Sequence, residues 1–397
     1  MSKIQGDLLS MDTSELSELI EKGEDSQTQF KETFESIDAL AAEICAFSNS
    51  NGGNIIVGVS DDGDITGLKK DEIHKLNEWV SSTCSQKIDP QVNVTTQNIK
   101  YQDRIIMIIS VPMGSNKFYM ANGKDIWVKV GADKRRAKRE EIQRLLQSSG
   151  HLYADEMPVE NTNLSDINID MFRSFYEHRT KETLENLNIP LEKLMSNLKL
   201  MTDGKLTLAG LLAFGKKPEE KKPQFIIKAV LFPGNSPAVS EYKDSRDISG
   251  NISKIFETAR SFLINNLRWV QKDQNFNTTG ILEIPKIALE EVLINAIVHR
   301  NYFISSNIRI FIFDNRVEII SPGALPNTIN VESIKLGIHI ERNPILVSML
   351  KDLEDIPYRG IGTGIQRILY ECENAGITVD FIEEKEAEQF KVIFHRN

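Results

Sequence analysis

The sequence predicts an α+β protein with more than one domain. Its 397 residues are too many for one ordinary hydrophobic core. Segments with helical spacing of apolar residues alternate with short apolar runs that are typical of strands. A polar stretch over residues 151–165 predicts a linker. We therefore expect an N-terminal domain over 1–150, a mixed α/β region over 166–270 and a C-terminal α/β domain over 271–397.

The N-terminal domain is expected to combine helices and strands. Asp12 or Thr13 would cap a helix over 11–22, and a largely apolar, buried helix is expected over 36–48. A break rich in asparagine and glycine at 49–53 separates that helix from a strand. The expected strands are 54–59, 65–68, 92–96, 104–111 and 125–130, and a further helix is expected at 140–147.

The rest of the chain is expected to alternate the same two kinds of element. Asp314-Asn315 predicts a hairpin turn between the last two expected strands. The expected helices are 206–214, 253–267 and 285–300, and the expected strands are 225–232, 309–313 and 316–320.

Composition excludes several classes of protein. Hydrophobic residues make up 40% and charged residues 26% of the chain, which is typical of a globular protein. No apolar run is long enough for a membrane helix, and the first residues lack the features of an export signal. Cys45, Cys84 and Cys372 lie far apart and match no zinc motif. We expect a cytoplasmic protein with no membrane partner.

The net charge of −10 hides an uneven distribution. Residues 1–43 carry 3 basic and 11 acidic side chains, whereas residues 66–150 carry 15 basic and 9 acidic ones. Because salt screens distant charges, a local basic patch can bind phosphates on an acidic protein. A run of five cations is either such a nucleic-acid contact or the solvated start of a helix. Its members are Lys134, Arg135, Arg136, Lys138 and Arg139.

A polar stripe crosses the expected helix over 285–300. Glu291, Asn295 and His299 are spaced at i, i+4 and i+8, which places them on one face of an otherwise apolar helix. An unsatisfied buried polar group costs about 1–3 kcal/mol, so the stripe needs partners. A structural polar network or a bound ligand would supply them.

A glycine-rich segment favours the ligand. Gly360, Gly362 and Gly364 alternate with other residues directly before a further expected helix over 365–372. Alternating glycines let the backbone approach a phosphate closely and present free N–H groups at the helix start. The order of polar helix, hairpin and glycine loop therefore predicts a nucleotide site.

Four short patterns follow one another in the last part of the chain. They are Glu291-x-x-x-Asn295-Ala296-x-x-His299-Arg300, a hairpin ending in Ser321-Pro322-Gly323, then Arg342-Asn343-Pro344, and Gly362-Thr363-Gly364-Ile365. In this order they resemble the divergent GHKL-type ATP-binding module, an α/β sandwich. That module ends the divergent AAA transcriptional regulators.

The resemblance implies ATP and Mg²⁺ as cofactors. Asn295 would coordinate Mg²⁺, and Glu291 would be the catalytic residue that polarises water in a slow Mg²⁺-dependent ATPase. Members usually carry an adenine-reading aspartate where Ser321 and Pro322 stand, which leaves base specificity and turnover open. The implied nucleotide-binding residues are Asn295, His299, Arg300, Gly323, Gly362, Thr363 and Gly364.

A second resemblance covers about residues 20–145. Gln29-Phe30-Lys31 follows Glu24, a helix holds Ala46-Phe47-Ser48-Asn49, and Gly52-Gly53 leads into a strand. This order resembles the Schlafen Alba-like domain, which implies nucleic-acid binding. Some Schlafens cleave RNA with clustered carboxylates and a divalent metal. Gln29 replaces the expected glutamate and weakens such a site, of which Glu24 and Asp61 would be remnants.

Together the two resemblances predict an ATP-binding, nucleic-acid-binding protein, and more narrowly a transcriptional regulator controlled by nucleotide. We expect DNA rather than RNA as the partner, and a homo-oligomer. Two alternatives stay open. One is a metal-dependent RNA or DNA endonuclease of Schlafen type in phage defence, against which Gln29 speaks. The other is a non-catalytic scaffold with a vestigial nucleotide site, against which the Glu291/Asn295 pair speaks.

Overall fold

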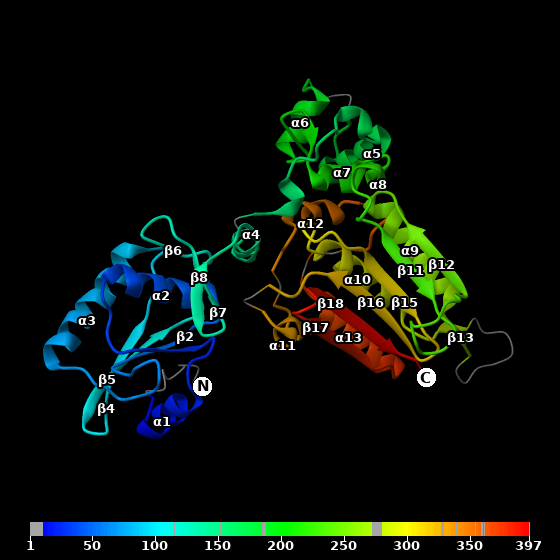
Figure 1. Ribbon diagram of the computed structural model, residues 1–397. Helices are drawn as coiled ribbons and strands as arrows, with labels where there is room; N and C mark the ends of the chain where they lie inside the picture. Colours follow the sequence, from blue (N-terminus) through cyan, green and yellow to red (C-terminus); the bar gives the residue numbers. More distant parts are fainter. Residues whose placement is uncertain are drawn as a thin grey trace, which may run out of the picture. The chain divides into compact units, whose positions relative to one another are not determined.

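The chain divides into two compact units, Met1–Leu152 and Tyr153–Asn397, which are described separately here. Figure 1 traces the helices and strands of both in a computed structural model. The structure describes residues 11–114, 116–150, 152–184, 188–271, 280–326, 329–338, 340–353, 355–358, 360 and 362–396.

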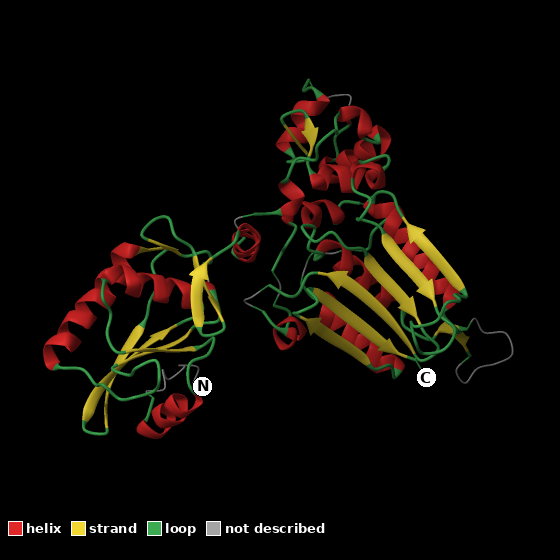
Figure 2. Ribbon diagram, viewed as in Figure 1, coloured by secondary structure: helices red, strands yellow, loops and turns green. Residues whose placement is uncertain are grey.

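The N-terminal unit is built on a four-stranded sheet with helices around it (Figure 2). The strand order is β1-β2-β5-β4, in which β1 and β2 are parallel and the other neighbours are antiparallel. The strands are β1 (Thr28–Lys31), β2 (Gly53–Val57), β4 (Thr95–Tyr101) and β5 (Arg104–Val111). The helices are α1 (Thr13–Lys22), α2 (Ile37–Asn49), α3 (Lys70–Ser82) with a π-helical turn over Thr83–Lys87, and α4 (Arg139–Ser148).

Both faces of this sheet are covered, because successive side chains of a strand point to opposite faces. On β2, Ile55 and Val57 belong to the cluster that includes the buried side of α2. Ile56 belongs to a second cluster with Leu16 of α1. The near-continuous apolar run of β2 is therefore explained by burial on both sides.

Helix α2 is held at its start by a serine cap and is followed by a glycine pair that the local packing requires. The hydroxyl of Ser36 accepts a hydrogen bond from the amide of Ala39 and caps the helix start. After the helix, Gly52 has a φ of +70°, and a Cβ there would lie 2.6 Å from the amide nitrogen of Met113. A Cβ on Gly53 would lie 2.3 Å from the carbonyl oxygen of Gln27. This glycine pair is thus required by close packing as well as by the turn.

Several N-terminal segments differ from the expectation. Residues 65–68 contribute only an isolated bridge between Val59 and Ile65. The basic run begins in a strand: β7 (Trp127–Val130) pairs with β8 (Asp133–Arg136) in an antiparallel hairpin, and α4 starts after it. The turn Gly131-Ala132, with Gly131 at a φ of +60°, closes this hairpin. Two short strands, β3 (Ile88–Asp89) and β6 (Met120–Ala121), pair with each other.

The C-terminal unit is a sheet covered along one face by helices (Figures 1 and 2). The six strands have the order β12-β11-β15-β16-β18-β17, with β11 and β15 parallel and the other neighbours antiparallel. They are β11 (Ile227–Leu231), β12 (Asp244–Ile248), β15 (Ile308–Ile312), β16 (Arg316–Pro322), β17 (Val379–Glu384) and β18 (Gln389–His395). The covering helices are α9 (Ile252–Asn266), α10 (Lys286–Val298) and α13 (Gly364–Ala375).

The expected middle region, 166–270, shares this sheet and its core. Strand β11 pairs with β15 from Ile227–Ile308 to Leu231–Ile312. One hydrophobic cluster runs from Ala154 to Phe394. The remaining elements are α5 (Ile169–Thr180), α6 (Leu191–Asn197), α7 (Leu208–Phe214), α8 (Pro218–Lys221), α11 (Val331–Lys335), α12 (Pro344–Leu350) and the short strands β9 (Met201–Thr202), β10 (Lys205–Leu206), β13 (Trp269–Val270) and β14 (Ile281–Leu282).

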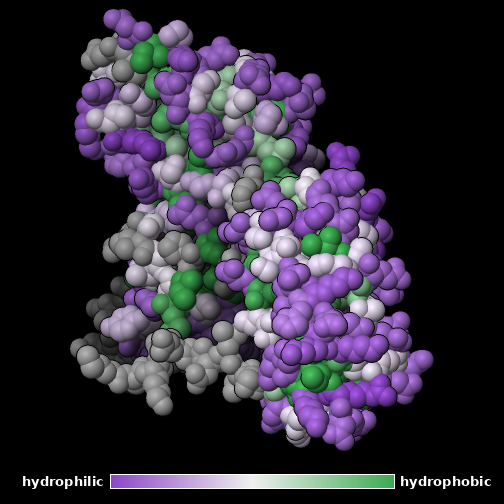
Figure 3. Space-filling model, turned by 90° about the vertical axis from the view of Figure 1, so that its left-hand side faces the viewer, coloured by the Kyte–Doolittle hydropathy of each residue, from purple (hydrophilic) through white to green (hydrophobic). Residues whose placement is uncertain are grey.

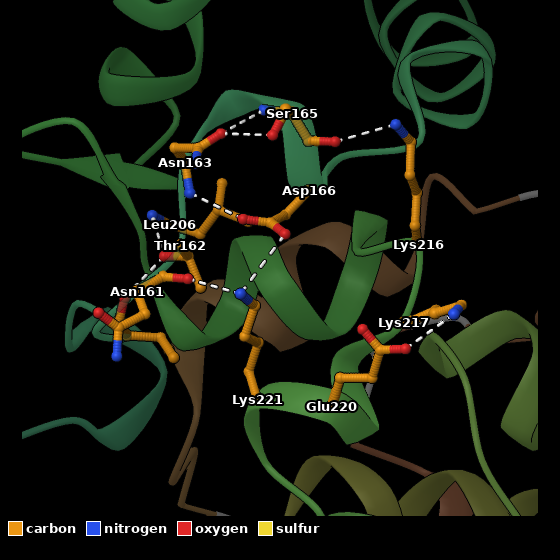
Figure 4. Close-up of polar contacts among 11 residues, drawn as sticks. Asn161, Thr162, Asn163, Ser165, Asp166, Leu206, Lys216, Lys217, Glu220 and Lys221 are labelled. Carbon is orange, nitrogen blue, oxygen red and sulfur yellow. Dashed lines mark hydrogen bonds and ion pairs between the residues drawn. The ribbon is translucent and has the colours of Figure 1, made fainter.

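The segment expected as a linker, 151–165, is folded where the structure describes it. It carries 3-10 helices at Ala154–Glu156 and Leu164–Asp166. Figure 4 shows how its polar groups bond to the helical region: the Nζ of Lys221 donates to the carbonyl of Asn161 at 2.6 Å, and the amide of Leu206 donates to the hydroxyl of Thr162 at 2.9 Å. Polar composition here reflects hydrogen bonding inside the fold, and composition alone does not distinguish that from a linker.

The surface in Figure 3 is mostly hydrophilic, with hydrophobic residues in separate areas. Within the described residues, no helix has the length and apolar character needed to cross a bilayer. Cys45, Cys84 and Cys372 are free thiols.

Candidate nucleotide site and nucleic-acid surface

Helix α10 positions the predicted polar stripe. It packs against α9, α13 and β16, so most of its circumference is buried. Glu291 is only 7% exposed, and Asn295 and His299 are half-buried. The helix ends at Val298, where the Nδ2 of Asn343 donates to the carbonyls of Val298 and Arg300 at 2.8 and 2.9 Å. Asn343 of the Arg-Asn-Pro motif thus holds the end of the polar helix.

A pocket of about 140 Å³ opens beside the stripe. Its walls come from α10, β16, β18, the start of α13 and the segment around α11. Most of the lining is aliphatic, with a few polar groups from α10 and the glycine loop, as in many small-molecule sites. The sequence-predicted residues that line it are Glu291, Asn295, His299, Gly323, Gly362, Thr363 and Gly364.

The glycine loop touches the polar stripe directly. A Cβ on Gly364 would lie 2.6 Å from the Oε2 of Glu291 and 3.4 Å from the Nδ2 of Asn295. Gly360 and Gly362 have φ values of +65° and +74°, which glycine adopts without strain. Gly364 is the first residue of α13, so the helix begins against the side chains of α10. Only glycine fits this approach without displacing Glu291.

Arg367 of α13 forms an ion pair with Glu291. Its Nη2 also donates to the hydroxyl of Thr363 at 3.4 Å. The pair links α10 to α13 inside the pocket and holds one oxygen of the carboxylate. Arg367 is not among the residues predicted from the sequence, although its position one turn into the helix after the glycine loop points to it.

Arg342 is a second guanidinium in the pocket lining. Its Nη1 donates to the carbonyl of His299 at 2.9 Å and its Nη2 to the carbonyl of Ala324 at 2.6 Å. Burial lowers the pKa of Arg342 to about 10, so it stays charged at neutral pH. Gly323, with a φ of +112°, makes room for it, because a Cβ there would lie 2.5 Å from that Nη1.

Ser321 is one of the two residues that the sequence motifs place where a base-reading aspartate would be expected. It is buried, and its hydroxyl donates to the carbonyl of Ala296 on α10 at 2.8 Å. The hydroxyl of Ser321 therefore donates its proton within the protein. Its oxygen can still accept a hydrogen bond from a group in the pocket, which Ser321 lines.

Arg300, expected at the nucleotide, does not line the pocket. It is 1% exposed, its Nη2 donates to the carbonyl of Ile304 at 3.1 Å, and its guanidinium lies 4.4 Å from the ring centroid of Phe225 and 4.8 Å from that of Tyr302. This environment lowers its pKa to about 10 by burial. Arg300 holds the loop after α10, and sequence spacing alone could not separate that role from ligand binding.

In the N-terminal unit, the two acidic residues expected as remnants lie in separate contacts. The carboxylate of Glu24 accepts hydrogen bonds from the side-chain amide of Gln29 and, at 2.7 Å, from the amide of Phe30. Asp61 pairs with Lys31 at 3.3 Å. Among the described residues, no three histidine, cysteine, aspartate or glutamate side chains gather as a metal site.

Asn49 of the Schlafen-like pattern acts within the fold. Its Nδ2 donates to the carbonyls of Tyr119 and Trp127 at 2.8 and 2.9 Å, and its Oδ1 accepts from the amide of Tyr119 at 2.7 Å. It joins α2 to the chain around β6 and β7, which accounts for a buried asparagine at this position.

The basic run is partly neutralised. Lys134 pairs with Glu43, Arg135 forms a bidentate pair with Glu141 at 2.7 Å, and Arg136 pairs with Asp125 at 3.2 Å. The Arg135 hydrogen bonds lower the pKa of Glu141 to about 2. The exposed cations of the run are Arg136, Lys138 and Arg139.

Comparisons with known proteins match three parts of the chain. The family described as Schlafen, AlbA_2 matches residues 24–138, and the family described as putative ATP-dependent DNA helicase recG C-terminal matches residues 305–394. A domain of unknown function matches residues 143–228. The second match includes Arg342 and the glycine loop and begins after α10. No curated protein matches the chain.

Two solved structures are similar to the chain at 18% identity. The DIP2311 protein from Corynebacterium diphtheriae covers 97% of this chain and 80% of its own length, with a TM-score of 0.45. The N-terminal domain of a putative ATP-dependent DNA helicase RecG-related protein from Nitrosomonas europaea covers 25% of this chain and 69% of its own length, with a TM-score of 0.20.

The chain therefore has a mixed α+β fold with a Schlafen, AlbA_2 domain at its N-terminus and an ATPase-like domain at its C-terminus. This confirms the Schlafen-like domain that the sequence motifs predict, and it confirms the C-terminal domain at the level of an ATPase-like domain. Together the domain types suggest binding of nucleotide and of nucleic acid.

Proposed function

We propose that the protein is a nucleic-acid-binding regulator whose state is set by ATP with Mg²⁺ in the C-terminal pocket. The observation that carries the proposal is the pocket itself. It brings together seven of the eight residues implied by the resemblance, from α10, the end of β16 and the glycine loop. The packing of a hydrophobic core does not by itself require a glycine-rich loop to lie against the side chains of a glutamate and an asparagine.

The chemistry of the lining fits a nucleotide. The aliphatic wall suits a base, and the N–H groups of the glycine loop at the start of α13 suit phosphates. Arg342 adds a fixed positive charge. Asn295 would offer Mg²⁺ a side-chain oxygen, and the metal would neutralise charge on the phosphates.

Glu291 is the group placed to act as a base, and Arg367 orients it. The ion pair fixes one carboxylate oxygen, while the other faces Gly364. A carboxylate held in this way can orient water next to a phosphate bound at the glycine loop. We therefore propose slow hydrolysis as a further activity of the same site.

DNA is the nucleic acid that we propose. The C-terminal match is to a family described by a DNA helicase, and residues 66–150 of the N-terminal unit carry 15 basic and 9 acidic side chains. Exposed cations at Arg136, Lys138 and Arg139 would contact backbone phosphates. Binding of labelled duplex DNA and of RNA of the same sequence, compared at equal salt, distinguishes the two partners.

Calorimetric titration with ATP and Mg²⁺ tests the nucleotide site. The parent protein should bind, and Asn295→Ala should bind more weakly or not at all because the proposed metal ligand is gone. The control is Asn374→Ala on the exposed side of α13, which should bind like the parent. Equal affinity of Asn295→Ala and the parent, or no heat with either, would leave the scaffold interpretation standing.

A further inference from the structure

A group of lysines lies among the acidic residues of the Schlafen, AlbA_2 domain, apart from the nucleotide pocket. The ammonium of Lys129, on β7, donates to the Oε1 of Gln29 at 2.5 Å and to the carbonyl of Ala132. It also lies 4.8 Å from the ring centroid of Phe47 on α2. Gln29 in turn bonds to Glu24, so Lys129, Gln29 and Glu24 form one chain of hydrogen bonds.

A second carboxylate faces the same lysine. Glu43 of α2 is 2% exposed, pairs with Lys134 at 2.8 Å, and has an Oε2 without a hydrogen-bond partner among the described residues. Burial lowers the pKa of Lys129, and the charges of Glu43 and Glu24 oppose that shift. The carboxylates on this side of the domain are therefore balanced by internal ammonium groups.

A third acidic residue of this domain also pairs with a lysine. Lys31, at the end of β1, pairs with Asp61 at 3.3 Å. Glu24, Glu43 and Asp61 thus each lie near a lysine ammonium, directly or through Gln29. This pairing differs from a metal site, in which acidic residues converge on one point and cations stay away.

These contacts do not fit a divalent metal at this position. Mg²⁺ and Mn²⁺ need several oxygen ligands, usually with more than one carboxylate. Here an amide replaces one carboxylate, its oxygen already accepts from the ammonium of Lys129, and its nitrogen donates to the carboxylate of Glu24. Two like charges at hydrogen-bonding distance from the same oxygen repel strongly in a partly buried site.

We propose that the ammonium of Lys129 is a built-in cation that takes the place of a divalent metal in this domain, so that the N-terminal unit contacts nucleic-acid phosphates without metal. Lys129 satisfies Gln29, compensates Glu24 and Glu43, and excludes a metal ion by its own charge. The inference stands apart from the nucleotide pocket, because it concerns residues of the other unit only.

The first test uses metal alone, without nucleotide. Mn²⁺ is titrated into the full chain carrying Asn295→Ala, which removes the metal ligand proposed in the pocket, and the melting temperature is followed. We expect no rise that depends on Glu24. A clear rise that Glu24→Gln abolishes would overturn the proposal. Binding of labelled DNA should be equal in EDTA and in Mn²⁺, and a loss of affinity in EDTA would also contradict it.

The second test removes the built-in cation in the same Asn295→Ala chain. Gln29→Glu alone should still show no Mn²⁺ effect, because the new carboxylate pairs with Lys129. Gln29→Glu combined with Lys129→Met should gain a Mn²⁺-dependent rise in melting temperature. Lys129→Gln serves in place of Lys129→Met if that variant does not fold. Lys124→Met, an exposed lysine in the nearby turn, is the matched control and should leave Gln29→Glu without a rise.

A folded double variant that shows no rise would mean that Lys129 is not what excludes the metal, and the proposal would fail. If neither double variant folds, the Mn²⁺ titration of the Asn295→Ala chain, with and without Glu24→Gln, still decides. Failure of the pocket to bind ATP would leave every one of these outcomes unchanged, so the two proposals are tested separately.

Discussion

Gly364 is the residue at which the backbone and the polar stripe of the pocket come closest. Because Gly364 has no Cβ, the start of α13 can lie directly against the carboxylate of Glu291. A single methyl group at this position must move Glu291, Asn295 or the loop itself. Because these are the groups proposed to meet the phosphates, the smallest change of sequence here should act on ligand binding.

Gly364→Ala should weaken the binding of ATP with Mg²⁺ at least tenfold and destabilise the fold by about 1–3 kcal/mol, the usual cost of overpacking. Gly376→Ala, at the other end of α13, is the control: its φ of +71° costs stability, but no atom lies within 4 Å of a Cβ there. Titration calorimetry and urea unfolding separate the two effects. Unchanged affinity of Gly364→Ala would mean that the loop does not approach the ligand.

Asp155 shows how a residue in the segment expected as a linker stabilises an element. Its Oδ2 accepts from the amides of Ile345 and Leu346 at the start of α12, at 2.7 and 3.0 Å. Burial raises the pKa of Asp155 from 3.8 to about 6, and the two backbone hydrogen bonds only partly oppose that shift.

The raised pKa predicts a pH dependence with a definite sign. Between about pH 4 and pH 6 the folded state holds the proton of Asp155 more tightly than the unfolded state, so the free energy of unfolding should fall as pH rises through this window. The loss should be about 2–3 kcal/mol. In Asp155→Asn the fall over this window should be absent, since the amide oxygen still accepts and nothing titrates. Urea unfolding of both proteins from pH 4 to 7 checks this, and parallel curves would contradict it.

At the scale of elements, α10 and α13 are joined by the ion pair of Glu291 and Arg367. Arg367→Met should destabilise the protein by on the order of 3 kcal/mol, because it removes the positive charge that is paired with a buried carboxylate. Glu291→Gln in the same chain should recover part of that loss. A double-mutant cycle in urea measures the coupling. Additive effects of the two changes would show that the pair contributes nothing beyond its separate contacts.

The elements that the sequence predicted well are those with a strong local signal. The helix over 285–300, the hairpin at Asp314-Asn315 and the glycine loop before α13 all appear within a few residues of the expected positions. Strand β1 and helix α3 were not expected. The sequence Thr-Gln-Phe-Lys of β1 has one apolar residue, and α3 buries only Leu76 and Val80. Such elements are set by pairing and packing with distant parts of the chain.

The residues of the candidate sites also divide into those with a local sequence signal and those set by distant contacts. Spacing on one helix identified Glu291, Asn295 and His299, because neighbours at i+4 share a face. It could not find Arg367 or Lys129 as partners, since each meets its contact from a different element. The same limit explains the wrong prediction for Arg300. Its position directly after the helix is compatible with ligand binding, but its side chain is buried and contacts other parts of the fold.

At the scale of the whole molecule, the chain has a net negative charge. Three exposed cations nevertheless lie close together in sequence on the N-terminal unit, from the end of β8 to the start of α4. Replacing Arg136, Lys138 and Arg139 together with alanine should weaken DNA binding and lower the slope of log affinity against log salt by about 2–3, at roughly 0.9 for each phosphate contact. Arg135→Ala should change the slope little, because Glu141 already holds that guanidinium. Equal slopes for the triple variant and the parent would remove this surface from the DNA contact.

The central claim is that nucleotide in one unit controls nucleic-acid binding by the other. The most direct test is the dissociation constant of a labelled DNA duplex, measured with and without saturating ATP and Mg²⁺. Coupling between two ligands is reciprocal, so a real link must change this constant and must change the affinity for ATP by the same factor when DNA is present. We expect a change of at least fivefold in the parent protein and none in Asn295→Ala. The same dissociation constant with and without nucleotide would contradict it.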